Sequence, residues 1–459
     1  MLSATDNDLL TRVGPGTPMG RLLREFWFPV LPSAEVESPG ARPLRIRLLG
    51  EDLVIFRNTA GEVGLLSEYC SHRGASLYFG RNEDEGLRCV YHGWLYSPNG
   101  RCLEMPAEPA DSNFKDKIAH PAYPCREVNG TIWAYMGPRA APPPLPDYGL
   151  ARMPVDHKAV RLTVRECNWM QALEGDLDLS HGAYLHSTVD EQYLGSNHLD
   201  RFLRETPHFE AVETEYGVAH AVRRGWDEDH DLWGIGHYFF PFLTLFPPVG
   251  DAMQVVPGHI WIPMDDRRTL VWSTQWHPMR PIAEESNQGT LGGGQSSRPS
   301  IFDWGWEQYA EPDPEPGGRW RQKGNRRNDY GFSEEAQLTR RYSGLPAVEL
   351  QDRGIQESMR PIVDRTIEHL GANDVPQIRV RQRLLKAVTA LEDQGTVPSC
   401  VDNPSAYRFR SATGLLPKAE SWIEGTRPWC ADELGVPVVA RGHRPPDFES
   451  RVAASRASR

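Results

Sequence analysis

Two short cysteine–histidine motifs carry the strongest chemical signal in the chain. Cys70 and His72 form a C-x-H motif, and sixteen residues further on Cys89 and His92 form a C-x-x-H motif. Two thiolates and two neutral imidazoles are the ligands of a Rieske-type [2Fe–2S] cluster, with two cysteines on one iron and two histidines on the other. The pair of motifs therefore predicts an iron–sulfur cluster bound by two short loops.

A zinc site, or core cysteines and histidines that share no ligand, could also produce these motifs. Zinc sites more often show C-x-x-C or H-x-x-x-H pairs, so the cluster accounts for the pattern better. Gly74 and Gly93 follow the two motifs and would let the backbone turn closely around the sulfides. Respiratory Rieske proteins join the loops by a disulfide, but the corresponding residues here are Ala75 and Tyr91. This difference favours the oxygenase type of cluster.

Asp178, His181 and His186 form a second pattern, D-x-x-H-x-x-x-x-H. Without other context, a surface aspartate and two histidines with ordinary partners would account for it better. The predicted cluster changes this judgement, because a one-electron carrier in so long a chain needs an electron acceptor. Two histidines and one carboxylate are the ligand set of non-haem Fe(II) oxygenases, so the pattern indicates a second metal centre.

The spacing of His181 and His186 constrains the helix that carries them. Five steps along an ideal helix turn by about 140°, so the two side chains would not share one face. We therefore expect the helix to be widened or broken between them. Asp178 could accept a hydrogen bond from the ring nitrogen of His181 that does not bind metal. Spacing alone leaves the carboxylate ligand open, and the acids considered are Asp329, Asp352, Asp364, Glu392 and Asp393.

Composition limits the class of protein. The formal net charge of −12 argues against a nucleic-acid-binding protein, whose surface would be basic. The seven cysteines show no secreted framework, which favours a reducing cytoplasm. No signal peptide is visible in residues 1–8, and the most apolar run, 238–246, is too short for a membrane helix. We expect a soluble, cytoplasmic protein of two domains.

The elements that must position these residues fall into two regions. Short strands separated by turn residues predict a small β region that ends near Gly137, with both cysteine–histidine motifs at turns. An Ala- and Pro-rich linker and a larger α+β region follow. In that region we expect strands at 204–224, 235–246, 259–264 and 270–276, and helices at 352–370 and 374–393.

Beyond the metal motifs, three segments resemble the Rieske non-haem iron oxygenase α subunits, most closely the phthalate dioxygenase group. They are 9–20 (LLTRVGPGTPMG), 167–178 (CNWMQALEGDLD) and 351–359 (QDRGIQESM). The resemblance covers nearly the whole chain. It implies an α+β fold, with a small all-β Rieske domain beside a catalytic domain whose antiparallel sheet is flanked by helices. The expected parts are an N-terminal helical segment packing on the catalytic domain (1–39), the Rieske domain (40–145), the catalytic domain (146–440) and a polar tail (441–459).

The resemblance also implies roles for individual residues. Cys70, His72, Cys89 and His92 would bind the cluster. The mononuclear iron would be held by His181, His186 and Asp352. The aspartate at 178 would bridge the first of these histidines and the second cluster histidine of a neighbouring subunit. Members of the family form trimers or stacked hexamers, so we expect a homo-oligomer.

The implied function is that of the terminal oxygenase of a multicomponent Rieske system. It would use O₂ to hydroxylate an aromatic, phthalate- or benzoate-like substrate in aromatic catabolism. Because no dinucleotide site is convincing, NADH would supply electrons through a separate flavin and iron–sulfur reductase. The alternatives are O-demethylation of a methoxylated aromatic acid and, with less support, an electron-transfer-only Rieske protein. Basic residues that could hold a substrate carboxylate are His208, Arg223, Arg224 and His237.

Overall fold

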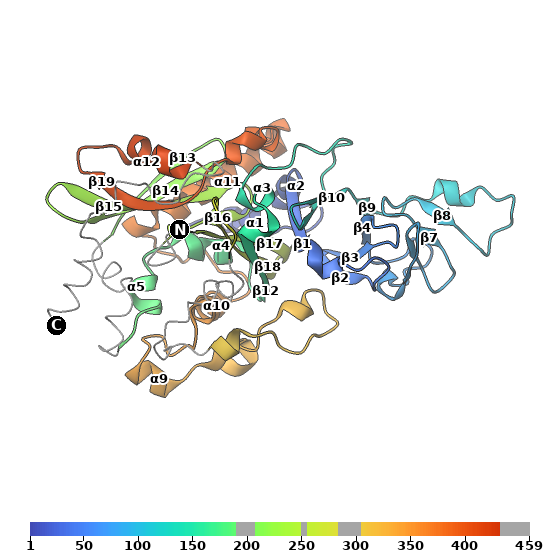
Figure 1. Ribbon diagram of the computed structural model, residues 1–459, viewed down its shortest axis with the longest axis horizontal. Helices are drawn as coiled ribbons and strands as arrows, with labels where there is room; N and C mark the ends of the chain where they lie inside the picture. Colours follow the sequence, from blue (N-terminus) through green and yellow to red (C-terminus); the bar gives the residue numbers. More distant parts are fainter. Residues whose placement is uncertain (190–206, 249–254, 283–303, 432–459) are drawn as a thin grey trace.

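The computed structural model describes residues 1–189, 207–248, 255–282 and 304–431 (Figure 1). The expected polar tail and the first three residues of the strand expected at 204–224 lie outside the described residues. Within these ranges, no helix combines the length and the apolar character needed to cross a membrane.

Two short helices open the chain and pack against a long helix from its C-terminal part. They are α1 (Ala4–Thr11) and α2 (Pro18–Arg24), and their N-termini are capped by the side chains of Ser3 and Thr17. Both contact α11 (Val375–Gln394), and α1 also contacts α4 (Trp169–Leu177). The N-terminal helices are thereby fixed to the helix that precedes His181.

The region that contains the cysteine–histidine motifs consists of short antiparallel strands. Two four-stranded sheets have the orders β2-β3-β4-β9 and β5-β6-β7-β8, and a three-stranded sheet has the order β1-β11-β10. The bounds are β1 (Trp27–Pro32), β2 (Leu44–Leu48), β3 (Glu51–Arg57), β4 (Val63–Ser67), β5 (Arg81–Asn82), β6 (Leu87–Arg88), β7 (Leu95–Tyr96), β8 (Cys102–Glu104), β9 (Ala122–Tyr123), β10 (Cys125–Val128) and β11 (Thr131–Tyr135).

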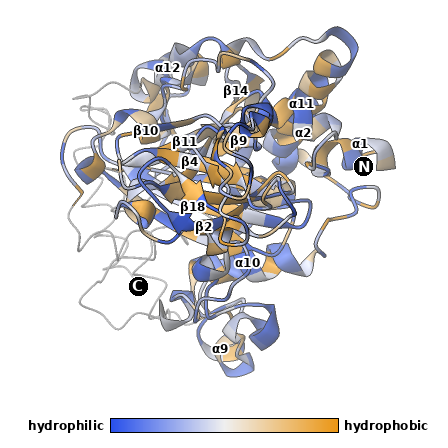
Figure 2. Ribbon diagram, turned by 90° about the vertical axis from the view of Figure 1, so that its right-hand side faces the viewer, coloured by the Kyte–Doolittle hydropathy of each residue, from blue (hydrophilic) through white to orange (hydrophobic). Residues whose placement is uncertain are grey.

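This region has an apolar core of its own around the motifs. Leu77, Leu87 and Tyr96 belong to it together with Cys70 and Cys89, and it is separate from the main core. Strands β1 and β11 instead contribute to the main core, which continues through the large sheet. Figure 2 shows apolar residues concentrated along the central strands, for example β18.

An antiparallel sheet of eight strands dominates the rest of the described chain. Its order is β12-β18-β17-β16-β15-β14-β13, and β19 pairs with β15 beside β16. The bounds are β12 (Lys158–Arg165), β13 (His208–Glu213), β14 (Gly217–Gly225), β15 (His230–Phe239), β16 (Leu243–Leu245), β17 (Val256–Asp265), β18 (Arg268–Trp276) and β19 (Ala412–Pro417).

The strand register assigns side chains to the two faces of this sheet. Cross-strand partners share a face, and successive residues alternate. His220 pairs with Gly236, and two residues further along β15 Tyr238 pairs with Thr244. Because Thr244 pairs with His259, the side chains of His220, Thr244 and His259 project from one face, called here the inner face.

Helices cover both faces. The inner face is covered by α4, whose Asp176 contacts His259, and by α10 (Val348–Ser358), whose Glu349 contacts Arg161 of β12. Helix α12 packs on the opposite face, where the ring of Trp422 stacks on Trp233 at 6.2 Å. The bounds of four further α-helices are α3 (Gly149–Arg152), α5 (Gly182–Leu185), α9 (Glu334–Thr339) and α12 (Trp422–Cys430).

The α+β class predicted from the sequence is confirmed, and so is the helix expected at 374–393, which is α11. The helix expected at 352–370 is wrong, because α10 begins four residues earlier and ends at Ser358. Arg360 has a left-handed φ of 78° and precedes a proline, and both features end a helix. The strand expected at 204–224 is a hairpin instead, because Gly217 has a φ of 149° after the turn.

Candidate metal centres

The two cysteine–histidine motifs lie in matched loops, one between β4 and β5 and the other between β6 and β7. In each loop the glycine N–H donates to the cysteine carbonyl, from Gly74 to Cys70 at 2.8 Å and from Gly93 to Cys89 at 3.0 Å. Both glycines have left-handed φ angles, 72° and 77°, which L side chains rarely adopt. The glycines therefore let each loop turn tightly around its cysteine.

The loops bring the four side chains of the motifs together. The ring centroids of His72 and His92 are 4.3 Å apart, and the thiols of Cys70 and Cys89 share a hydrogen bond. The thiol of Cys89 donates to Cys70 and, despite burial, lowers the pKa of Cys70 to about 5. The same contact, together with burial, raises the pKa of Cys89. Two sulfurs held this close, with one readily ionised, suit metal–thiolate bonding.

Further contacts fit this pocket to a [2Fe–2S] group. Nδ1 of His72 is buried and has no hydrogen-bond partner among the described residues, as expected of a nitrogen reserved for a metal. The ring of Trp94 stacks on His72 at 4.5 Å, and the hydroxyl of Tyr96 lies 3.1 Å from Sγ of Cys70. Cys70, His72, Cys89 and His92 thus have the composition and proximity that a Rieske cluster requires.

His181, His186 and Asp352 form the second centre. Nε2 of His181 lies 3.1 Å from Nε2 of His186 and 3.2 Å from Oδ1 of Asp352. Nε2 of His186 lies 3.3 Å from the same carboxylate oxygen. Among the described residues, this is the set of three metal-binding side chains whose ligand atoms all lie within 4.8 Å of one another. One ion could contact all three, so of the five acids considered the structure joins Asp352 to the histidines.

The two histidines flank a helical turn that is separate from α4, so the break in the helix lies before His181 and not between the histidines as expected. Helix α4 ends at Leu177, and α5 is a single turn of four residues. His181 is the residue before this turn and His186 the residue after it. Their rings meet at 4.9 Å with an angle of 77° between the planes. The two rings therefore converge across one helical turn, at whose end His186 leaves helical geometry with φ −97° and ψ 1°.

The charges of the second centre favour a cation. Burial would lower the pKa of His181, but hydrogen bonding to Asp352 and the nearby Asp178 raise it to about 9. Burial would raise the pKa of Asp352, but His186 and His181 bring it well below its ordinary value. The carboxylate thus favours positive charge beside the two imidazoles, which a divalent ion would supply.

Asp178 lies beside His181 on the side away from Asp352. Its Oδ2 is 3.8 Å from Nδ1 of His181, and its Oδ1 accepts the backbone N–H of Ser180 at 2.9 Å. The side chain of Asp178 remains 30% exposed, so the carboxylate is accessible from outside this chain.

Gln351 orients the other histidine and was not identified from the sequence. Its Oε1 lies 2.7 Å from Nδ1 of His186, and its amide nitrogen donates to the carbonyl of Leu345 at 3.2 Å. The amide is therefore oriented with its oxygen toward the imidazole, so Nδ1 of His186 carries the proton and Nε2 is free to bind metal. The only feature of the sequence that could have pointed to Gln351 is its position directly before Asp352.

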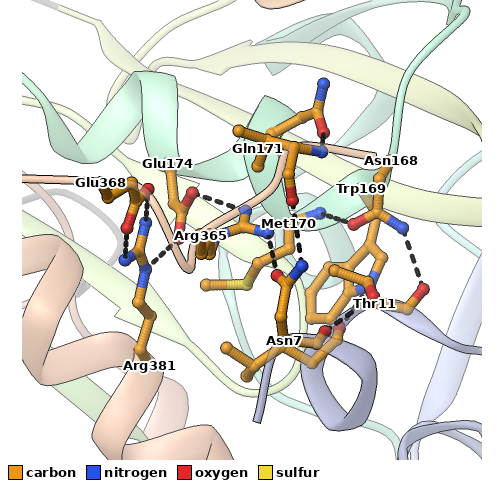
Figure 3. A network of polar contacts seen from close by, with 12 residues as sticks. Asn7, Thr11, Asn168, Trp169, Met170, Gln171, Glu174, Arg365, Glu368 and Arg381 are labelled. Carbon is orange, nitrogen blue, oxygen red and sulfur yellow. Dashed lines mark hydrogen bonds and ion pairs between the residues drawn. The ribbon is translucent and has the colours of Figure 1, made fainter. Parts of the chain in front are cut away.

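A buried ion-pair network holds α4, the helix that precedes His181 in the chain (Figure 3). The carboxylate of Glu174 accepts from Arg365 at 2.7 Å and from Arg381 of α11. Arg381 also binds Glu368 at 2.6 and 2.8 Å. Burial would raise the pKa of Glu174, but the two arginines lower it below its ordinary value.

Neutral hydrogen bonds complete the attachment of α4. Asn168 donates to the carbonyl of Thr11 in α1 at 2.9 Å (Figure 3). Gln171 donates to the carbonyls of Gln356 and Arg360 at 3.0 and 2.8 Å. Helix α4 is thereby tied directly to the end of α10, the helix that carries Asp352.

The basic residues considered for a substrate carboxylate do not form one group. His208 is exposed, and Arg223 pairs with Asp231 at 3.1 Å on the outer face. His237 is buried on the same outer face, where its ring bonds the hydroxyl of Tyr216 and a backbone carbonyl. Of these four candidates, Arg224 projects from the inner face, where it is buried.

Two family matches cover most of the chain. Residues 26–124 match the Rieske [2Fe-2S] domain family. Residues 134–293 and 309–433 match the family described as LigXa C-terminal domain like. The second match contains His181, His186 and Asp352, and the first contains the four cluster residues.

Two relatives match over nearly their whole length. The oxygenase subunit of 3-chlorobenzoate-3,4-dioxygenase from Comamonas testosteroni is 36% identical over 92% of this chain and 97% of its own. The oxygenase subunit of phthalate 4,5-dioxygenase from Pseudomonas putida is 32% identical over 98% of this chain and 99% of its own. The resemblance to the phthalate dioxygenase group is therefore confirmed.

A solved structure shares the fold. The terminal oxygenase of carbazole 1,9a-dioxygenase from Novosphingobium sp. KA1 aligns over 83% of this chain and 98% of its own, with 19% identity and a TM-score of 0.53. Sequence, fold and the two candidate centres agree: this chain belongs to the Rieske non-haem iron oxygenases, as an oxygenase subunit, and carries the Rieske [2Fe–2S] cluster of that family.

Proposed function

We propose that the chain is the terminal oxygenase of a multicomponent system that hydroxylates a small aromatic substrate. The observation that carries this proposal is the convergence of His181, His186 and Asp352 in a chain that also holds a Rieske cluster. When bound, the cluster would supply electrons one at a time, and the mononuclear iron would supply activation of dioxygen.

The chain's own residues supply geometry and proton positions. His181 and His186 present Nε2 atoms, and Asp352 presents one carboxylate oxygen, which leaves other positions around an ion open. Gln351 keeps the proton of His186 on Nδ1. Asp178 places its negative charge 3.8 Å from Nδ1 of His181 and offers its exposed side to a second imidazole.

We infer that this second imidazole is His92 of another copy of the chain. His92 lies just before β7, whereas His181 precedes α5, and β7 and α5 lie at opposite ends of the long axis of the molecule (Figure 1). A direct relay from His92 through Asp178 to His181 is therefore incompatible with a single chain. A cyclic homo-oligomer that places one end against the other, as in a trimer, would supply the contact.

The relatives support a proposal for the substrate, and the redox partner is proposed beside it. Both relatives described above are named for aromatic acids, so we propose a benzoate- or phthalate-like substrate for this chain as well. Electrons would arrive from a separate flavin and iron–sulfur reductase.

Iron analysis tests the proposal. Fully loaded protein is expected to contain three irons per chain, two in the cluster and one at the second centre. His181→Ala should lose one iron and keep the visible absorption of the cluster. The matched control is His230→Ala, because His230 also pairs with an aspartate, at 3.0 Å, but lies in the β14–β15 turn region. Two irons in loaded wild type contradict the proposal.

Product analysis with the reductase present then separates ring hydroxylation from demethylation. Hydroxylated phthalate or chlorobenzoate without formaldehyde supports the proposed reaction. Formaldehyde from a methoxybenzoate would instead establish the O-demethylation alternative.

A further inference from the structure

A second polar cluster lies on the inner face of the sheet, outside the metal centres. Asp176 of α4 accepts from Nδ1 of His259 at 2.8 Å and from the hydroxyl of Thr244. The hydroxyl oxygen of Thr244 in turn accepts the indole N–H of Trp261 at 2.8 Å. The four residues Asp176, Thr244, His259 and Trp261 are called here the Asp176 cluster. Two donors hold its carboxylate in one orientation.

The cluster fixes the tautomer of His259. Because Asp176 occupies the Nδ1 side with a hydrogen-bond acceptor, Nδ1 carries the proton and Nε2 presents a lone pair. Nε2 has no hydrogen-bond partner among the described residues, and the side chain is 20% exposed. The histidine therefore presents an oriented acceptor to the space beside the sheet.

The surroundings suit a flat organic molecule. The rings of Phe246 and Trp261 lie 5.4 and 5.0 Å from the ring of His259. Phe246 is partly exposed like His259, although most residues of these strands are buried. An aromatic ring could pack against them while one polar substituent reaches Nε2.

His220 provides a second and independent observation on the same face. It is 1% exposed, and neither of its ring nitrogens has a partner among the described residues. A Cβ on Gly236, its cross-strand partner, would lie 2.3 Å from Cε1 of His220, so the glycine makes room for this ring. Burial lowers the pKa of His220 to about 4, although the charge of Asp176 opposes the shift. A buried, neutral and unpaired imidazole beside the cluster indicates a missing hydrogen-bonding partner.

The position of the cluster links it to the second metal centre. Asp176 lies two residues before Asp178 and five before His181 in the sequence, at the end of α4. The inner face is also the face that α10, with Asp352, covers through Glu349. A molecule bound at His259 would therefore lie between the sheet and the helices that carry the iron ligands.

We propose that His259, oriented by Asp176, binds a hydroxyl group on the aromatic ring of the substrate. This inference rests on the proposed oxygenase function and specifies its substrate as a hydroxylated aromatic. The lone pair on Nε2 can accept a hydrogen bond, and a phenolic hydroxyl can donate that hydrogen bond. A carboxylate offers no donor and would face the negative charge of Asp176. A substrate carboxylate, where one is present, therefore binds elsewhere.

Calorimetric titration of the iron-loaded protein tests the proposal with defined probes. Benzoate is compared with the ortho, meta and para hydroxybenzoates, which add one hydroxyl to the same ring. At least one isomer is expected to bind about tenfold more tightly than benzoate, the value of one well-placed hydrogen bond. His259→Leu should abolish this preference and leave the iron content unchanged.

Asp176→Asn is the sharper variant, because it keeps the volume of the side chain and leaves His259 in place. An asparagine amide can donate to Nδ1, which moves the proton to Nε2 and turns the acceptor into a donor. The preference for hydroxybenzoate should then disappear, a result that lost packing would not produce. His230→Leu removes a different aspartate-paired histidine and should keep the preference.

The proposal is overturned if wild type prefers no hydroxybenzoate, or if the preference survives in His259→Leu or Asp176→Asn. The outcome is independent of the iron analysis. A hydroxyl preference in a chain with two irons would support this site and refute the oxygenase function. An active enzyme with three irons but without the preference would refute this site and support the oxygenase function.

Discussion

Gln351 shows how one neutral side chain can control a metal ligand. Replacing it with leucine would leave Nδ1 of His186, whose side chain is 12% exposed, without an acceptor and free the ring to turn. We expect Gln351→Leu to weaken Fe(II) binding about 10- to 100-fold, as loss of such supporting contacts typically does. Chelator competition measures the affinity, and the cluster absorption should not change. Gln351→Glu keeps the acceptor and should retain most of the affinity; an equal loss in both variants would contradict this role.

Tyr96 has a comparable relation to the cluster. Its hydroxyl lies 3.1 Å from Sγ of Cys70, and a donor to a cluster sulfur stabilises the more negative, reduced state. Tyr96→Phe should therefore lower the reduction potential. About 1 kcal/mol, the net value of one hydrogen bond, corresponds to about 40 mV for one electron. Redox titration followed by the visible spectrum measures the shift, and an unchanged or higher potential would exclude the hydrogen bond.

At the scale of elements, the position of α4 depends on Glu174. Its carboxylate lies between Arg365, which is fully buried, and Arg381, which is 5% exposed. Glu174→Ala would leave two buried guanidinium groups without this partner, so we expect a loss of about 3–5 kcal/mol in unfolding free energy. Glu392→Ala removes the partner of Arg21 in a pair that is 48% and 30% exposed, and should cost under about 1 kcal/mol. Denaturant unfolding compares the two, and equal losses would argue against a special role for the buried pair.

The elements also show which features the sequence could predict. Local patterns sufficed for α11 and for the cluster loops, because apolar periodicity, glycines and ligand spacing act within a few residues. The end of α10 at Ser358 was missed although Pro361 is a local signal for it; the left-handed Arg360 and the tertiary contact that holds it are visible only in the structure. The pairing of Asp176 with His259 joins residues 83 apart, and only the packing of α4 on the sheet reveals it.

For the whole molecule, the sequence predicted the two centres better than their surroundings. His181 and His186 share one motif, whereas the choice of Asp352 needed the resemblance, because the chain between them contains many chemically equivalent acids. The proposed substrate contacts were beyond prediction from spacing, since the inner face is assembled from strands far apart in sequence. The basic residues named as candidates divide between two faces and the surface for the same reason.

Buried histidines predict how the whole molecule responds to acid. Burial lowers the pKa of His220 to about 4 and that of His237 to about 3, whereas both would titrate near 6.5 in the unfolded chain. The unfolded state therefore binds more protons, so the stability due to neutral burial is complete above about pH 6.5 and is lost as the pH falls toward 4. In this range each histidine can change the free energy of unfolding by up to about 1.4 kcal/mol per pH unit. Unfolding of wild type and His220→Leu between about pH 7.5 and 5 should show a shallower acid loss in the variant. His230→Leu, at a histidine whose side chain is 41% exposed, should follow wild type, and parallel curves for all three proteins would show that His220 is not neutral and buried.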